Sequence, residues 1–112
     1  MEYPLCDQTV TVYRKMGNRI FRQVLTNCWL CMGEKIEEGV QGRSLHRPFS
    51  LVAPGEQQQV FAGDRVMGGV GPVITAGEWS GFLPAAVPGL AEVAYAESFY
   101  EGGRFSHVEA GG

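Results

Sequence analysis

Charged residues, cysteine and histidine are all scarce in this 112-residue sequence, and long hydrophobic runs are absent. Only 19% of the residues are charged, and the net charge is −3. This composition argues against nucleic-acid binding through a broad basic face, because such binding needs many cations. The uncharged stretch at residues 66–77 is too short and too rich in glycine to span a bilayer. No cationic segment precedes an apolar run after Met1, so we expect no secretory signal and a cytosolic location.

Three cysteines are too few to complete a structural zinc site by themselves. Cys28 and Cys31 have the CxxC spacing of half a zinc site or of a redox pair, but only Cys6 remains elsewhere. His46 and His107 lie far apart, without the i, i+4 spacing of helical ligands. In a strand, positions 28 and 31 project from opposite faces, so their thiols neither share an ion nor bond each other. We interpret both as packing residues and keep a small metal- or thiol-dependent interaction module as the alternative function.

Motifs of nucleophilic catalysis and phosphate binding are also missing. Ser80 lacks the G-x-S-x-G surroundings of a nucleophile elbow. His107 and Glu109 share one face of a predicted strand, a pairing that is far more often a surface feature than a catalytic dyad. No Lys-Ser/Thr pair follows the glycines of residues 68–71. We therefore predict a protein that is not an enzyme, with no catalytic residue, no cofactor-binding residue, no metal ligand and no cofactor.

The residues that are abundant favour strands and turns. Valine occurs twelve times against seven leucines, and there are sixteen glycines. β-Branched side chains suit a pleated sheet, whereas glycine penalises helices and supplies turns. The length suits one domain over residues 1–112, and parallel βαβ units would need long crossovers for which there is no room. We predict a mainly β fold, a small antiparallel β-barrel or sandwich of about six strands with long Gly/Pro-rich loops and at most one short helix.

The first half of the chain predicts a hairpin followed by a loop. Residues 9–13 alternate as a half-buried strand, and Gly17-Asn18 supplies a turn. The second strand covers residues 19–32, where both parities carry large apolar groups, so it is buried on both faces or bent by a bulge. Residues 33–42 hold four charged residues between glycines and are expected to form an exposed, mobile loop.

The second half predicts shorter strands between glycine and proline turns. We expect a strand over residues 45–52 whose Pro48 lies at a sheet edge, because proline cannot donate to a strand ladder. A tight turn is expected at Gly63-Asp64, and Pro84 interrupts two possible helical turns over residues 78–86. The other expected elements are a short strand after the turn, a short strand at 73–75, a strand at 91–100, a hairpin connector at 101–103 and a returning strand at 104–109.

Three segments together resemble small proteins encoded in the morphogenesis region of Firmicutes phages and prophages. Residues 3–4 and 9–13 (YP and TVTVY) resemble the opening of these proteins, and FRQVL at 21–25 runs into Cys28-Trp29 where their second strand ends in a hydrophobic-Trp pair. Residues 61–69 (FAGDRVMGG) resemble their turn of the form GD, hydrophobic, x, G. Residues 104–111 (RFSHVEAG) resemble their closing H-I/V-E-V-x-G strand, with Ala110 where a β-branched residue is usual.

The resemblance implies a structural phage or prophage protein of the head–tail connector or tail terminus. This family includes head-closure, stopper and tail-completion proteins, similar in fold to small β-barrels that stack as rings below the portal. It implies a homo-oligomeric ring, contacts with portal, adaptor or tail proteins, and no membrane. DNA passes through the channel of such rings without sequence-specific binding. The implied location is the virion, with the host bacterial cytoplasm during assembly, and residues 33–42 and 68–72 are expected docking loops.

Overall fold

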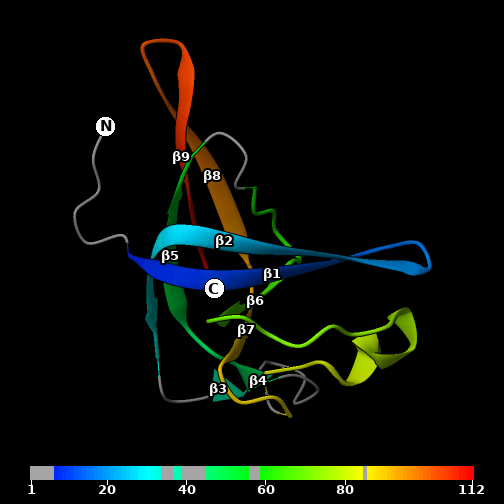
Figure 1. The fold of residues 1–112 in the computed structure, drawn as a ribbon. Helices are drawn as coiled ribbons and strands as arrows, with labels where there is room; N and C mark the ends of the chain where they lie inside the picture. Colours follow the sequence, from blue (N-terminus) through cyan, green and yellow to red (C-terminus); the bar gives the residue numbers. More distant parts are fainter. Residues whose placement is uncertain (1–6, 34–36, 39–44, 56–58, 85) are drawn as a thin grey trace.

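One antiparallel sheet of seven strands forms the body of the computed structural model, which describes residues 7–33, 37–38, 45–55, 59–84 and 86–112. The order of its strands is β7-β6-β1-β2-β5-β9-β8, and β3 pairs with β4 in a separate two-stranded sheet (Figure 1). The strands are β1 Gln8–Met16, β2 Arg19–Met32, β3 Glu37–Glu38, β4 Leu45–His46, β5 Phe49–Pro54, β6 Arg65–Gly68, β7 Leu90–Glu92, β8 Tyr95–Glu101 and β9 Arg104–Gly111.

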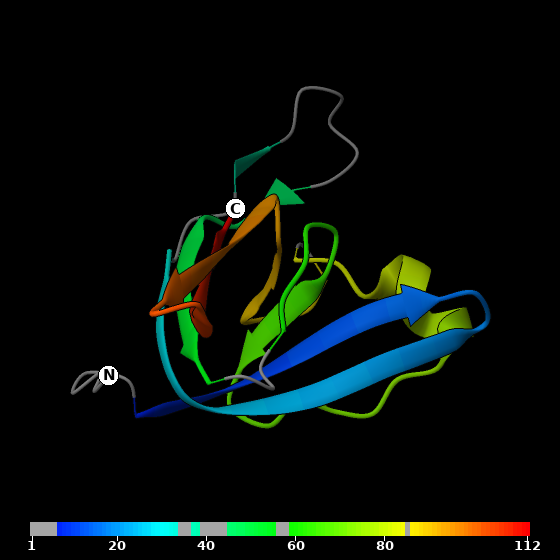
Figure 2. The ribbon, with the colours of Figure 1, turned by 90° about the horizontal axis from the view of Figure 1, so that it is seen from above.

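The seven-stranded sheet curls into a half-barrel (Figure 2). Its two edge strands, β7 and β8, follow each other directly in the chain through Val93 and Ala94. Backbone hydrogen bonds fix this junction, because Gly63 N–H donates to the Val93 carbonyl and Val93 N–H donates to the Asp64 carbonyl, both at 2.8 Å. The predicted mainly β, antiparallel fold is therefore confirmed.

Strand β2 covers the predicted residues 19–32, and of the two alternatives expected for it, burial on both faces or a bulge, it has the bulge. Its pairing with β1 shifts by one residue between Val10–Leu25 and Gln8–Cys28, and Asn27 has a φ of 56°. Because the extra residue changes the parity, Leu25 and Cys28 both face the core. Beyond the bulge, β2 leaves β1 and pairs with β5, so the bulge lies where the sheet turns its corner.

The concave face of the half-barrel holds the main hydrophobic core. Alternating residues of β1, β5 and β9 point into it, because successive side chains of a strand leave on opposite faces. Its buried members are Val10, Val12, Leu25, Cys28, Phe49, Leu51, Ala53, Val60, Val66, Ala91, Val93, Val108 and Ala110.

The outer face of the sheet is covered on one half only. We call β7, β6, β1 and the paired part of β2 the covered half, because the segment from Gly69 to Gly89 packs on its outer face with the 3-10 helix η1 Ala76–Gly81 (Figures 1 and 2). This packing forms a second cluster of Tyr13, Ile74, Phe82 and Leu90. Strands β5, β9, β8 and the end of β2 form the open half, and neither cluster of the described residues reaches its outer face.

Two strand predictions are wrong. The strand expected at 45–52 splits into β4 and β5, because Pro48 has no N–H for a ladder, and β5 then runs as an inner strand between β2 and β9. Pro48 therefore lies between strands rather than on a sheet edge, and its carbonyl accepts from Gly33 N–H at 2.8 Å. Residues 73–75 form no strand, since Ile74 packs with Tyr13 in the second cluster and Thr75 N–H donates to the Glu78 carboxylate at the start of η1.

The remaining elements differ mainly in their bounds. The helix begins at Ala76 rather than 78 and ends at Gly81, before Pro84, because Thr75 N–H donates to the Glu78 carboxylate at 2.9 Å and fixes its first turn. The strand expected at 91–100 is divided into β7 and β8, which form the two opposite edges of the seven-stranded sheet. Most of the loop predicted at 33–42 lies outside the described residues.

Candidate interaction surfaces

The two cysteines of the CxxC motif lie in different environments. Cys28 is fully buried in the main core, whereas Cys31, three residues along β2, is exposed. The thiols therefore do not lie together on one face of the strand. In the part of the chain that the structure describes, no three His, Cys, Asp or Glu side chains come close enough to hold a metal ion. Cys6 and the side chain of His46 lie outside that part.

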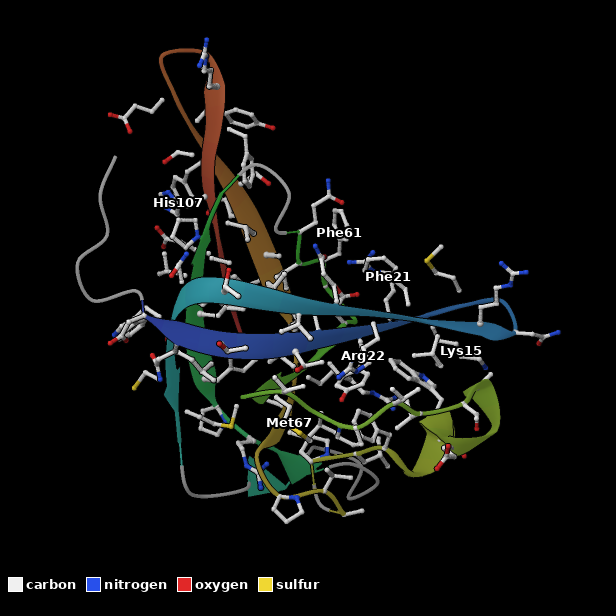
Figure 3. The ribbon with its side chains drawn as sticks, in the orientation of Figure 1. Lys15, Phe21, Arg22, Phe61, Met67 and His107 are labelled. Carbon is white, nitrogen blue, oxygen red and sulfur yellow. The ribbon has the colours of Figure 1, made fainter. Side chains whose placement is uncertain are left out.

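His107 and Glu109 do lie on one face of β9, as predicted. The His107 Nε2 atom is 2.9 Å from a Glu109 oxygen, and its Nδ1 atom is 3.1 Å from the Ser106 hydroxyl. The imidazole also stacks on Phe99 of β8, with ring centroids 4.8 Å apart. Figure 3 shows His107 on the side of β9 that faces away from the β1–β2 hairpin. This arrangement on the outer face of the open half orients the imidazole.

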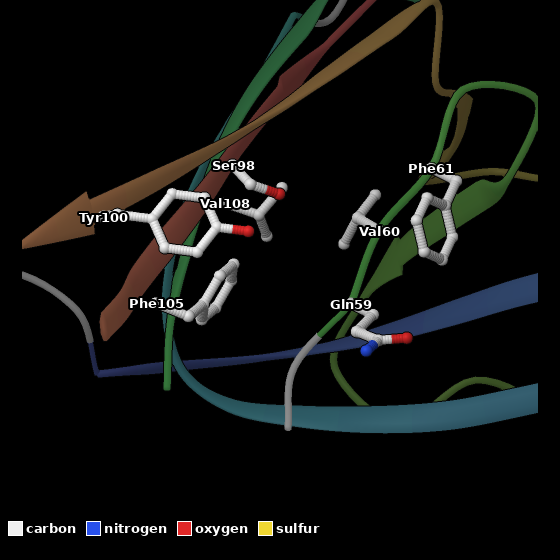
Figure 4. A pocket seen from close by; sticks show the side chains of 7 residues that line it. All are labelled: Gln59, Val60, Phe61, Ser98, Tyr100, Phe105 and Val108. Atoms are coloured by element: carbon white, nitrogen blue, oxygen red, sulfur yellow. The ribbon is translucent and has the colours of Figure 1, made fainter. Parts of the chain in front are cut away.

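An aromatic cleft opens between the β8–β9 hairpin and the segment that precedes β6 (Figure 4). Its volume is about 340 Å³. Tyr100 and Phe105 form one wall, with their rings edge to face at 5.8 Å, and Val60 and Phe61 form the other. None of the described residues that line the cleft is charged. The full lining is Gln59, Val60, Phe61, Ser98, Tyr100, Phe105 and Val108.

The chemistry of this aromatic cleft suits an apolar side chain from another protein. Tyr100 is 66% exposed and Phe61 is 50% exposed, so much apolar surface still contacts water. Burying such surface is favourable by roughly 25 cal/mol for each Å². Ser98 and Gln59 supply polar groups at the cleft, and none of its described lining residues is Asp, Glu, His, Lys or Arg. The exposed rings make the cleft a candidate docking site.

Arg14 fixes the β1–β2 hairpin against the rest of the molecule. Its Nε and Nη2 atoms donate to the two oxygens of the buried Asp64, at 2.8 and 2.7 Å. The guanidinium also lies 5.1 Å from the Phe21 ring centroid and 4.4 Å from that of Phe61. Figure 3 shows Phe21 and Phe61 on one side of the hairpin and Lys15 and Arg22 on the other. This bidentate ion pair between two aromatic rings makes the hairpin a braced projection.

Two buried arginines hold the segment that covers the outer face. Arg65 donates to the carbonyls of Trp79 and Phe82, the latter at 2.7 Å, and its guanidinium lies 3.8 Å from a Trp79 ring centroid. Arg47 donates to the Leu90 carbonyl at 2.6 Å. Burial lowers the pKa of Arg65, and the nearby Glu92 carboxylate partly offsets this effect. Carbonyl oxygens thus accept hydrogen bonds from both guanidinium groups, which would otherwise be costly to bury, while the buried Arg65 Nε has no hydrogen-bond partner and lies 3.5 Å from a Glu92 oxygen.

A valine loop, residues 69–75, is held firmly at its base and exposes its two valine side chains, whereas its Ile74 is buried in the second cluster. The Thr11 hydroxyl donates to the Gly69 carbonyl at 2.7 Å and accepts from Gly71 N–H at 2.8 Å. The Tyr13 hydroxyl donates to the Pro72 carbonyl, and Arg22 donates to the Gly71 carbonyl. The side chains of Val70 and Val73 are nevertheless 72% and 79% exposed. The loop is thus a preorganised apolar projection.

The hydroxyl of Tyr13 is the titratable group that the valine loop buries. It donates to the Pro72 carbonyl at 2.7 Å, and the ring packs edge to face on Phe82 at 4.7 Å. Burial raises the pKa of Tyr13 above its ordinary value of 10.0, although the nearby Arg22 works in the opposite direction. The protonated phenol is the form that can donate this hydrogen bond.

The sequence pointed to only part of these surfaces. Residues 68–72 were an expected docking loop, but Val73 was assigned to a strand, so half of the apolar projection was missed. The aromatic cleft was missed entirely, because its walls come from residues some forty positions apart. One signal was present in the uncharged stretch 66–77, whose residues 69–75 form neither strand nor helix and carry the exposed Val70 and Val73.

Comparison with models of known families, with curated proteins and with solved structures gave no match for this chain. Among the helices of the described residues, none is long and apolar enough to cross a membrane.

Proposed function

We propose that this protein is a non-enzymatic structural subunit of a tailed phage or prophage, placed at the head–tail connector or at the tail terminus. It assembles into a homo-oligomeric ring and bridges neighbouring portal, adaptor or tail proteins. Its location is the virion, with the host bacterial cytoplasm during assembly. The three segments that resemble small phage morphogenesis proteins support this proposal.

The valine loop is the observation that carries the proposal. Four hydrogen bonds to β1 and β2 side chains fix its backbone, yet Val70 and Val73 project into solvent. A surface that is already ordered loses little conformational entropy when a partner covers it, which favours tight docking. An assembly subunit needs this combination of a rigid framework and exposed apolar side chains.

Two further features fit an assembly subunit. The aromatic cleft offers a place for an apolar side chain of a neighbour. Strand β8 is an edge strand of seven residues, with one row of backbone groups not paired within the sheet. Exposed edges are commonly covered by another chain.

Deletion of the gene in a lysogen that makes particles tests the proposal. We expect filled heads and separate tails to accumulate, with joined virions lost, as seen by electron microscopy of an induced lysate. Complementation with the Val70→Ser/Val73→Ser variant should fail, whereas Val24→Ser, which alters an exposed valine on β2, should restore joined virions. A normal yield of infectious particles from the deletion strain would contradict the proposal.

The alternative function is a metal- or thiol-dependent interaction module built on Cys28 and Cys31. The exposed thiol of Cys31 is the observation in its favour, and the burial of Cys28 weighs against a shared site. Elemental analysis and thiol titration of the purified protein test it. Stoichiometric zinc, or loss of partner binding in a folded Cys31→Ser variant, would favour this module over the connector subunit.

A further inference from the structure

The outer face of the open half carries apolar side chains and carboxylates, and its one cation among the described residues is Arg104, which pairs with Glu101 at the turn end of the β8–β9 hairpin. Residues that pair across the strands form rows on this face, because paired residues of a sheet point the same way. One row runs from Trp29 through Val52 and Glu109 to Glu97. We call this surface the acidic face, and its members are Trp29, Val52, Tyr95, Glu97, Phe99, His107 and Glu109.

Two carboxylates lie directly opposite each other on the acidic face. Glu97 of β8 pairs with Glu109 of β9, and like charges at such positions destabilise a sheet. His107 contacts Glu109, but among the described residues Glu97 has no ion-pair partner. A cation brought by another molecule would relieve this repulsion.

The β1–β2 hairpin has the complementary chemistry. Residues 8–32 contain four cations and no carboxylate, whereas the rest of the chain contains five cations and all twelve carboxylates. Arg14 is already engaged by Asp64 and Arg22 by the Gly71 carbonyl, so the two cations available at the exposed end are Lys15 and Arg19. Met16 and Phe21 are exposed apolar side chains at this end that share one face of the hairpin with Arg19, whereas Lys15 lies on the other face, and we call the set of Lys15, Met16, Arg19 and Phe21 the basic tip.

We infer that the basic tip of one copy docks on the acidic face of a second copy. Figures 1 and 2 place the end of the β1–β2 hairpin and the outer face of β5 and β9 at opposite ends of the molecule. The two surfaces therefore cannot meet within one copy, and each copy uses one surface toward each neighbour. Such head-to-tail contacts are heterologous, and they propagate into a ring or a filament. The inference rests on the proposed ring assembly and names the interface that builds it.

Charge complementarity and apolar packing both act in this contact. Arg19 approaches Glu97 and Glu109, and Lys15 adds positive charge on the other face of the tip, so that opposite charges across the interface offset the like-charge pair. Met16, which is 56% exposed, meets the aromatic side chains of the acidic face, where a thioether packs well. The bracing of the hairpin by Arg14 keeps the basic tip ordered before it docks.

Charge exchange between the two surfaces tests the inference. Sedimentation analysis of the purified full chain at low salt should show concentration-dependent association that weakens as salt is added. Arg19→Glu and Glu97→Lys should each weaken association about tenfold or more, because each places like charges in contact. The double variant Arg19→Glu/Glu97→Lys should regain most of the wild-type association, since each copy then presents an acidic tip to a basic face.

Arg104→Glu is the matched control, because it makes the same charge change on an exposed residue of β9 at the turn end of the hairpin, away from the Glu97–Glu109 pair. It should leave association unchanged. Circular dichroism and the urea midpoint verify folding, and Arg19→Gln and Glu97→Gln provide milder variants, each with an expected loss of a few-fold.

Several outcomes would overturn this inference. A wild-type chain that stays monomeric at every concentration excludes the contact, and an association unaffected by both reversals places the interface elsewhere. Failure of the double variant to recover means that the two residues do not face each other. If deletion of residues 1–6 changes the association while the charge reversals do not, that segment, rather than a second copy, is the occupant of the acidic face. None of these results bears on joined virions in the gene deletion, so the proposed function is tested separately.

Discussion

The two long hairpins of this protein share a local design and differ in everything around it. The β1–β2 hairpin turns at Gly17-Asn18 and the β8–β9 hairpin at Gly102-Gly103, each through two residues. The stem of β1 is covered on both faces, with Val12 and Tyr13 fully buried on opposite sides. No residue of β8 is buried.

Their charges differ as sharply as their burial. The β1–β2 hairpin carries four cations and no carboxylate, whereas β8 and β9 together carry three carboxylates and one arginine. Buried ion pairs and hydrogen bonds hold the first hairpin, and exposed ring stacking orders the second. Turn chemistry specifies a hairpin, but the segments that cover it decide whether it is a fixed projection or an open surface.

Removal of the Asp64 carboxylate should give the largest loss of stability. Asp64→Ala leaves Arg14 without its bidentate partner and Phe61 N–H without its acceptor at 2.9 Å. We expect the free energy of unfolding to fall by about 3 kcal/mol or more, measured by urea denaturation. Asp64→Asn, which keeps an acceptor for the N–H group, should cost less. A loss under about 1 kcal/mol for the alanine variant would show that the hairpin is not braced through this pair.

A matched pair of glycine substitutions compares the two halves of the sheet. A Cβ at Gly71 collides with the hydroxyl of the buried Tyr13, and a Cβ at Gly111 would lie 2.5 Å from the hydroxyl oxygen of the exposed Tyr95. Gly71→Ala should therefore cost about 2 kcal/mol, and Gly111→Ala under about 1 kcal/mol, because only the exposed ring can swing away. Thermal unfolding measures both.

Gly81→Ala is the control for this pair, since nothing lies within 4 Å of the added carbon, and it should be close to neutral. Equal losses of unfolding free energy for Gly71→Ala and Gly111→Ala would mean that the covered half and the open half do not differ in how well they accept an added carbon.

The Tyr13 hydroxyl should make stability fall at alkaline pH. Because its pKa is raised in the folded protein, the folded state holds the proton more tightly than the unfolded chain does. This contribution is fully present below pH 10.0, the ordinary value, and is lost as the pH rises through the folded-state pKa. Tyr13→Phe should cost about 1 kcal/mol near pH 7 and should flatten the alkaline decline. Urea titrations at several pH values check both, and an unchanged alkaline slope would contradict the assignment.

The His107–Glu109 contact should have the smallest effect. Glu109→Gln removes one exposed carboxylate and also relieves its repulsion from Glu97. We expect the free energy of unfolding to change by less than about 0.5 kcal/mol in either direction. The same denaturation assay measures it, and a loss comparable to that of Asp64→Ala would mean that the second hairpin is braced like the first.

The alternation of apolar residues and the turn glycines were enough to predict most strands. The hairpin at Gly17-Asn18, the full extent of β2 and its bulge follow from period-two patterning and from apolar residues on both parities. The prediction of a strand at residues 73–75 is wrong: a β-branched triplet is typical of a strand, yet Ile74 packs on the covered half and Thr75 bonds to Glu78 at the start of η1. No local pattern could predict the roles of Arg65 and Arg47, since both bind carbonyls of residues distant in the sequence.

Local patterns in the chain were enough to predict the mainly β class, the positions of both hairpin turns and the opposite orientations of Cys28 and Cys31. These features depend on neighbours within a few residues, where backbone geometry leaves few choices. Packing between distant segments, in contrast, covers one half of the sheet and leaves the other facing solvent. It also set Glu97 opposite Glu109 and the basic tip at the far end of the molecule. Strand pairing over long separations creates these relations, and no local signal encodes them.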